Sequence, residues 1–268
     1  MGEANEAPVD RIASFLPRRL ISGLAPRPEG ALHRELSAAC LVTDISGFTD
    51  LTQRLAEQGP KGVEHLSAIL DDFCGQLSAR VDQHGGELVA IVGDAVVSIF
   101  EHTEDDARSG VARAASCAAA IVRELDGRSF DGSHPLRLRA GVGSGRTVAV
   151  RVGTAERWEL AVAGDAVADA FSTQSDAAPG EVALAPRALE LLGKRASWTP
   201  GSDGQGPSLD ALSAPHGATA ERADTSAGQE LFGYLPAVVR ARMIDSGGEW
   251  LPELRPVTAV FIRLDDID

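Results

Sequence analysis

The stretch LVTDISGFTDL (Leu41–Leu51) decides how the first part of this chain folds. Its first residues continue an apolar run, AACLVTDI, which favours a buried strand because Val and Thr prefer extended structure. Asp44 places a charge at the end of that strand, and a helical pattern follows the turn Ser46–Thr49. We expect the hydroxyl of Ser46 or Thr49 to cap this helix. The stretch therefore combines a carboxylate with a helix start whose free amides can bind an anion.

The residues after this turn predict a helix, a hairpin and a second helix. Apolar residues at helical spacing predict a helix over 61–83, and Gly85-Gly86 ends it. Two apolar runs, ELVAIV and AVVSIF, are joined by Gly93-Asp94 and indicate a β-hairpin. An alanine-rich helix is expected over 105–126, with acidic residues at its start.

The middle of the chain returns to strands. The alternating segment PLRLRAGV predicts a half-exposed strand, and we expect GSGRT to turn the chain back into VAVRVG. RWELAVAG then indicates a strand, DAVADAFSTQ a helix, GEVALAP a strand, and 187–193 a short helix. The predicted fold class is α+β: a ferredoxin-like βαββαβ core with an added βαβ extension, in which helices pack on one face of an antiparallel-rich sheet.

Composition excludes several classes of protein. The net charge of -14 argues against a nucleic-acid binder, which needs a basic surface. The three cysteines have no CxxC spacing, which is typical of reduced thiols in a cytosolic protein. No apolar run approaches the ~20 residues that span a bilayer, and the acidic N-terminus does not resemble a signal peptide. We therefore expect a cytoplasmic protein that binds neither membrane nor nucleic acid.

Two aspartates are the main candidates for chemistry. Asp44 ends the first strand, and Asp94 lies in the hairpin turn. The first and third strands of a ferredoxin-like sheet are neighbours, so the two carboxylates can converge at one end of the sheet. Each aspartate alone is more simply interpreted as a helix cap or a turn residue. Their combination in this strand order favours a Mg²⁺ site, because Mg²⁺ prefers oxygen ligands and bridges substrate phosphates.

Four segments resemble the successive motifs of the class III nucleotide cyclase catalytic domain over residues 36–197. They are TDISGFTDL, GGELVAIVGDAVVSIF, LRAGVGSGRTVAVRVG and LAVAGDAVADA. The chain is most similar to the N-terminal catalytic half of tandem-domain soluble adenylyl cyclases of the bicarbonate-responsive type. The resemblance implies that this half, once paired with a complementary second domain, converts ATP to cyclic AMP and pyrophosphate in intracellular signalling.

This resemblance divides the chain into four parts. Residues 1–35 form a lead-in to the catalytic domain, and 198–253 form a linker with a helix near 231–246. Residues 254–268 are similar to the first strand of a second cyclase domain, truncated here. Arg263 stands in that strand where the first domain has its strand-end aspartate.

The resemblance also implies roles for individual residues. Two Mg²⁺ or Mn²⁺ ions would be bound by Asp44, Asp94 and the carbonyl of Ile45. The triphosphate would be bound by Ser46, Gly47, Phe48, Thr49 and Arg139.

Several family positions lack the expected group. Self-pairing members have a lysine where this chain has Ala90, and a base-recognising aspartate at Ala161. The ribose-orienting asparagine and the transition-state arginine fall at Ala168 and Ser172. A complementary cyclase domain, in the same longer chain or a separate one, would then supply these groups, and the isolated chain would be nearly inactive. Bicarbonate control is not expected, because Ala90 and Phe171 replace the anion-binding lysine and arginine.

Three alternatives remain open from the sequence. The first is a catalytically degenerate cyclase-fold module with a regulatory or dimerising role. The second is a guanylyl cyclase, because the base-recognising residues are not in this half. The third is another metal-dependent phosphotransferase on the same fold.

Overall fold

The structure, a computed structural model, describes residues 16–17, 20–21, 32–129, 135–154, 157–199, 208–212 and 233–235. Most of the predicted lead-in, the helix expected near 231–246 except for 233–235, and the strand expected from 254 onward lie outside the described residues.

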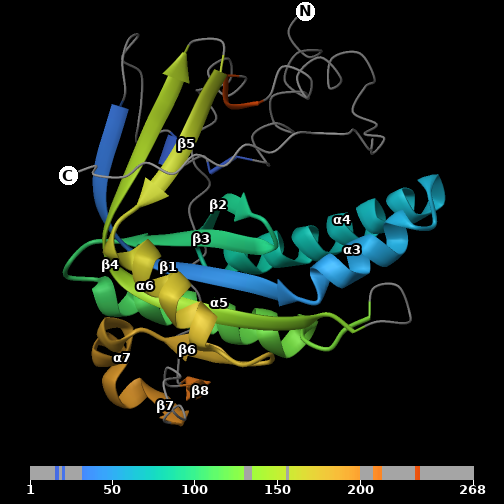
Figure 1. The fold of residues 1–268 in the computed structure, drawn as a ribbon. Helices are drawn as coiled ribbons and strands as arrows, with labels where there is room; N and C mark the ends of the chain where they lie inside the picture. The colour runs from blue at the N-terminus through green and yellow to red at the C-terminus, as the bar shows by residue number, and fades with distance from the viewer. Residues whose placement is uncertain are drawn as a thin grey trace, which may run out of the picture.

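The described strands form one sheet with the order β2-β3-β1-β4-β6-β8-β7, and β5 pairs with β4 (Figure 1). All pairings are antiparallel except that of β4 with β6. The strands are β1 (Leu32–Ser46), β2 (Glu87–Val92), β3 (Ala95–His102), β4 (Arg137–Thr154), β5 (Arg157–Ala163), β6 (Val182–Leu184), β7 (Ala196–Thr199) and β8 (Ser208–Leu212).

The helices lie close to their predicted positions. They are α3 (Phe48–Ala56), α4 (Pro60–Gln83), α5 (Ala107–Leu125), α6 (Asp165–Asp176) and α7 (Pro186–Leu192), followed by a 3₁₀ turn at Gly193–Arg195. Among the described helices, none combines the length and the apolar character needed to cross a membrane. The predicted α+β class is confirmed by this arrangement of helices against a sheet.

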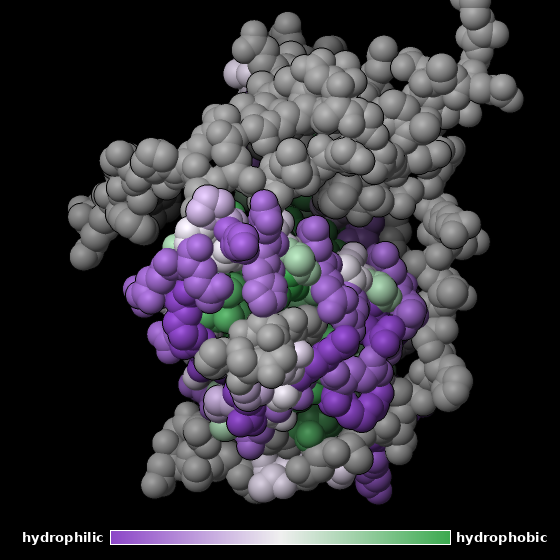
Figure 2. Space-filling model, turned by 90° about the vertical axis from the view of Figure 1, so that its right-hand side faces the viewer, coloured by the Kyte–Doolittle hydropathy of each residue, from purple (hydrophilic) through white to green (hydrophobic). Residues whose placement is uncertain are grey.

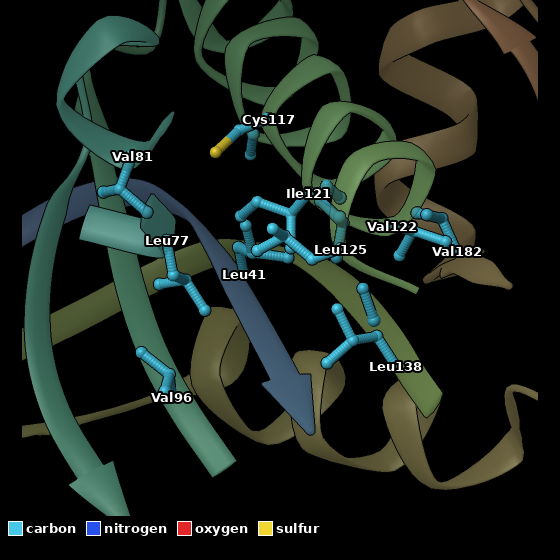
Figure 3. Packing of buried hydrophobic residues seen from close by; sticks show 14 of the residues in the cluster. Leu41, Leu77, Val81, Val96, Cys117, Ile121, Val122, Leu125, Leu138 and Val182 are labelled. Carbon is cyan, nitrogen blue, oxygen red and sulfur yellow. The ribbon is translucent and has the colours of Figure 1, made fainter. Parts of the chain in front are cut away.

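Two hydrophobic clusters lie on opposite faces of the sheet. Odd-numbered residues of β1, including Leu41, pack with α4 and α5 in the first cluster. Figure 3 shows Ile121 and Leu125 of α5 over this strand. Even-numbered residues of β1, including Cys40, pack with Ala166 and Ala170 of α6 in the second cluster. Helices therefore cover both faces, and the prediction that they pack on one face only is wrong because α6 lies on the other.

Strand β4 is continuous for 18 residues, so the turn predicted at GSGRT is wrong. The glycines of that segment serve a different purpose, which is close approach of α6. A Cβ on Gly141 would lie 2.3 Å from the carbonyl oxygen of Ala170, and one on Gly143 would lie 2.3 Å from that of Ala166. Glycine in a strand interior often marks such an approach.

We expect Gly143→Ala to lower the free energy of unfolding by about 3 kcal/mol or more, because the new methyl group would meet backbone atoms of α6 that cannot move independently. Gly75→Ala is the matched control. Gly75 lies inside α4, and a Cβ added there would have no neighbouring atom within 4 Å, so this change should stabilise the chain by about 1 kcal/mol. Urea unfolding of both variants measures the difference. Equal stability of the two variants would contradict the packing role of Gly143.

The sheet extends into the predicted linker. Strands β7 and β8 pair with each other, and Ala183 of β6 pairs with Ser208 of β8. Neither strand was expected, since Gly, Ser and Pro dominate the sequence between them and hide the short periodic runs.

Candidate functional site

Asp44 lies at the end of β1, on the face of the sheet that α6 covers. It continues the even-numbered series of β1 whose apolar members belong to the second cluster. Its register partners are Ala95 on β3 and Arg139 on β4. Only 7% of the residue is exposed. A largely buried carboxylate needs a charged or hydrogen-bonding partner, so its surroundings are informative.

Asp94 lies directly beside this position. Gly93, with φ 65°, and Asp94 form the turn between β2 and β3. The next residue, Ala95, is the register partner of Asp44 across β1 and β3. The sheet therefore places Asp44 and Asp94 at the same end of two neighbouring strands, as the sequence predicted. Among the described residues, the side chain of Asp94 has no hydrogen-bond or ion-pair partner, so its carboxylate is available to a ligand.

The turn after Asp44 begins α3 without a side-chain cap. Gly47 is the N-cap residue with φ 87°, a left-handed conformation that glycine adopts most easily. Neither Ser46 nor Thr49 caps the helix, so the predicted hydroxyl cap is wrong. The first helical bond runs from the amide of Leu51 to the carbonyl of Gly47 at 3.1 Å. The preceding amides of this turn thus remain available to an anion, as expected at a helix start.

Arg139 makes a contact that the sequence did not predict. Its Nε donates a hydrogen bond to Oδ2 of Asp44 at 2.7 Å. The side chain of Asp44 is 11% exposed and that of Arg139 is 32% exposed. The resemblance places this arginine on phosphates, whereas here it neutralises the aspartate. The two residues are 95 positions apart in the sequence, and the signal that joins them is their shared register across β1 and β4.

The donor set at this end of the sheet suits a hard divalent ion. It brings together two carboxylates, Asp44 and Asp94, with Ile45 next to Asp44; the resemblance implies that the Ile45 carbonyl is a further ligand, and its side chain is anchored in the first cluster. Within the described ranges, no group of three or more His, Cys, Asp or Glu side chains could hold a metal. An ion here would thus complete its shell with water and substrate oxygens, which is how Mg²⁺ is usually bound.

The positions that depart from the family pattern lie around α6 and the outer strands. Ala90 lies on β2 and is half-buried against the second cluster, as is Phe171 on α6. Ala161 on β5 and Ala168 and Ser172 on α6 are exposed. Methyl and hydroxymethyl groups carry no charge, so these side chains do not provide the charged groups that the resemblance places at three of these positions.

The cysteines do not form a second site. Burial raises the pKa of the Cys40 thiol to about 12 and also raises that of Cys117. The pKa of Cys74 is raised by partial burial and by the nearby Asp71 carboxylate. Thiols with raised pKa values are poor nucleophiles near neutral pH, which argues against cysteine catalysis.

In Figure 1 the end of β1 points to the right of the view, where α3 begins. Figure 2 shows the molecule from that side: the described surface is mainly hydrophilic, with small apolar areas between polar side chains.

Comparisons with known proteins show which proteins this chain is similar to. The adenylate cyclase type 10 of Rattus norvegicus is 24% identical over 70% of this chain and 12% of its own length. An adenylate cyclase of Mycobacterium bovis is 30% identical over 70% of this chain and 42% of its own length. The chain thus spans less than half of the length of each of these curated relatives.

A solved structure shares the fold. The guanylate cyclase domain of a Catenaria anguillulae protein, crystallised with GTP, superposes with a TM-score of 0.55 and 20% identity. The match covers 66% of this chain and 95% of that domain. The family described as the adenylate and guanylate cyclase catalytic domain matches residues 33–203. This chain belongs to the adenylate and guanylate cyclase catalytic domain family.

Proposed function

We propose that this chain is the metal- and triphosphate-binding half of an adenylyl cyclase that converts ATP to cyclic AMP and pyrophosphate when paired with a complementary cyclase domain. The observation that carries the proposal is the convergence of Asp44 and Asp94 at the ends of β1 and β3, beside the uncapped start of α3. A purely structural module has no need for two adjacent carboxylates beside free amides.

In the proposed reaction the ribose 3′-oxygen attacks the α-phosphorus. The 3′-hydroxyl loses its proton to water, and a new phosphorus–oxygen bond closes the ring. The bond between the α-phosphorus and the oxygen that bridges to the β-phosphate breaks, and pyrophosphate leaves with that oxygen. Asp44, Asp94 and the Ile45 carbonyl would hold two Mg²⁺ or Mn²⁺ ions. When bound, these ions lower the pKa of the 3′-hydroxyl and offset charge on the phosphoryl oxygens.

The remaining residues of this half would bind and orient the substrate. The backbone of Ser46–Thr49 would donate hydrogen bonds to the triphosphate, which the left-handed Gly47 makes possible by letting the chain turn closely. Arg139 would contact the phosphates once it leaves Asp44. Positioning and charge stabilisation of this kind account for most of the catalysis in phosphoryl transfer.

The complementary domain would supply what this chain lacks. The exposed Ala161, Ala168 and Ser172, together with Ala90, provide no group for base recognition or transition-state charge. The same four positions favour a second candidate, a catalytically degenerate regulatory or dimerising module. The retained Asp44 and Asp94 support the enzyme instead, because such a module would gain nothing from them.

An activity assay of this chain paired with a complementary cyclase domain distinguishes the enzyme from the regulatory module. With ATP and Mn²⁺ we expect cyclic AMP and pyrophosphate in equal amounts, a lower rate with GTP, and complete loss of activity with excess EDTA. The adenylate cyclase relatives support the choice of ATP. Products are separated by chromatography. A higher rate with GTP would make this a guanylyl cyclase, and a pair that assembles without converting either nucleotide would establish the regulatory module.

A further inference from the structure

The sheet places Arg139 opposite Asp44. The two residues are directly opposite in the antiparallel register of β1 and β4, so neither long loops nor helix ends are needed to bring them together. The 2.7 Å bond from Arg139 Nε to Asp44 Oδ2 lies within the range of strong charge-assisted hydrogen bonds. The chain therefore presents this carboxylate already paired with a cation.

This pairing conflicts with metal binding at the same oxygen. A divalent ion at Oδ2 would take the place of the guanidinium, and an ion at the neighbouring Oδ1 would still lie beside it, where like charges repel strongly in a largely buried position. Asp44 is too buried to swing into solvent, whereas the Arg139 side chain is a third exposed. Arg139 is thus the partner that can move.

We propose that Arg139 closes the metal site until a polyphosphate arrives. In the nucleotide-free chain the guanidinium neutralises Asp44 and excludes the divalent ion; the phosphate groups of the substrate then draw the guanidinium away and free the carboxylate. Metal and triphosphate would accordingly bind together. This inference rests on the proposed function of Asp44, and it makes Arg139 a positioning residue that acts through Asp44 before it contacts substrate.

The inference predicts an effect of opposite sign to that of a merely structural ion pair. If the pair only stabilised the fold, Arg139→Gln would weaken every property of the site. If Arg139 excludes the metal, the same change should strengthen the binding of Mn²⁺ in the absence of nucleotide. The strongest exposed ion pairs are equivalent to about a fivefold change in affinity. Because Asp44 is largely buried, removal of the competing arginine should tighten Mn²⁺ binding at least about that much.

Calorimetry and electron paramagnetic resonance of nucleotide-free protein measure Mn²⁺ binding directly. We expect weak binding by the wild type and at least about fivefold tighter binding by Arg139→Gln. Arg137→Gln is the matched control, because Arg137 lies two residues earlier on β4 and pairs with Asp126, 3.0 Å from its Nε. This control should bind Mn²⁺ as the wild type does.

Melting temperature provides a second readout that also reports on folding. Arg139→Gln should melt below the wild type without metal, since a largely buried carboxylate loses its partner, and Mn²⁺ should restore much of that loss. The double variant Asp44→Asn/Arg139→Gln should show no response to Mn²⁺. If the wild type and Arg139→Gln bind Mn²⁺ equally well through Asp44, the inference is overturned but the proposed function stays intact. Mn²⁺ binding unaffected by Asp44→Asn would overturn the metal assignment itself.

Discussion

Asp94→Asn should cut cyclic AMP formation by the paired protein at least about 10²-fold, the scale seen when one charge-stabilising group is removed from a catalytic site. Asparagine has nearly the shape of aspartate and is well suited to turns, and the side chain of Asp94 has no partner among the described residues. The turn between β2 and β3 should therefore survive. The loss would come from the missing negative charge, because a neutral amide holds a divalent ion far less well.

Initial rates with ATP and Mn²⁺, together with melting temperatures, check this expectation. Asp71→Asn on the exposed side of α4 is the control for loss of one negative charge, and its rate should equal that of the wild type. Asp44→Asn should lose as much activity as Asp94→Asn but is the less clean test, because it also removes the partner of Arg139. A stable Asp94→Asn protein with at least half of the wild-type rate would refute the metal assignment.

Local pattern was sufficient to predict most of the elements that position the site. The apolar run 38–45 predicted the buried part of β1, although this strand begins earlier, at Leu32 in the predicted lead-in, and the Gly93-Asp94 hairpin was correct in both strands. The convergence of the two aspartates followed from the order of these elements, because the first and third strands are neighbours in a ferredoxin-like sheet. The backbone of the candidate site was therefore predictable before any contact was known.

Glycine was the main source of error. The sequence around Gly143 predicts a turn, since glycine-rich runs usually end strands. Its role depends on α6, which packs on the face of the sheet that holds the second cluster. There α6 approaches the backbone of β4 too closely for a Cβ at Gly141 or Gly143. A tertiary contact of this kind leaves no trace in the periodicity of β4. The same limitation concealed the position of α6 on the second face.

The Arg139–Asp44 contact illustrates a further limit. A resemblance transfers the role that a residue has when substrate is bound, and it predicted a phosphate contact for Arg139. The free chain must satisfy the buried charge of Asp44 by other means, and the residue opposite it in the sheet does so. The contact could have been found from the sequence only by deriving the register of β1 and β4.

The largest gain of function should come from restoring the four missing groups in this chain. The change is Ala90→Lys, Ala161→Asp, Ala168→Asn and Ser172→Arg, which gives each self-paired chain a metal half and a base-binding half. Ala161, Ala168 and Ser172 are exposed, so longer side chains fit there without repacking the core. We expect cyclic AMP formation at least about 10²-fold above that of the wild-type chain, because base positioning and transition-state charge would both return.

Mixing experiments then test whether the active site is truly divided between two domains. The quadruple variant with Asp44→Asn added should be inactive alone, since neither of its two sites can hold the metal. Wild-type chain alone should also be inactive, since neither of its sites has the base-binding groups. Their equimolar mixture can assemble one complete site, with Asp44 and Asp94 from one chain and the four restored groups from the other, and activity should reappear only in the mixture. If the wild-type chain alone is as active as the quadruple variant alone, the division of the site is refuted. If the mixture forms heterodimers yet stays inactive, the restored groups are not the ones that this metal half requires.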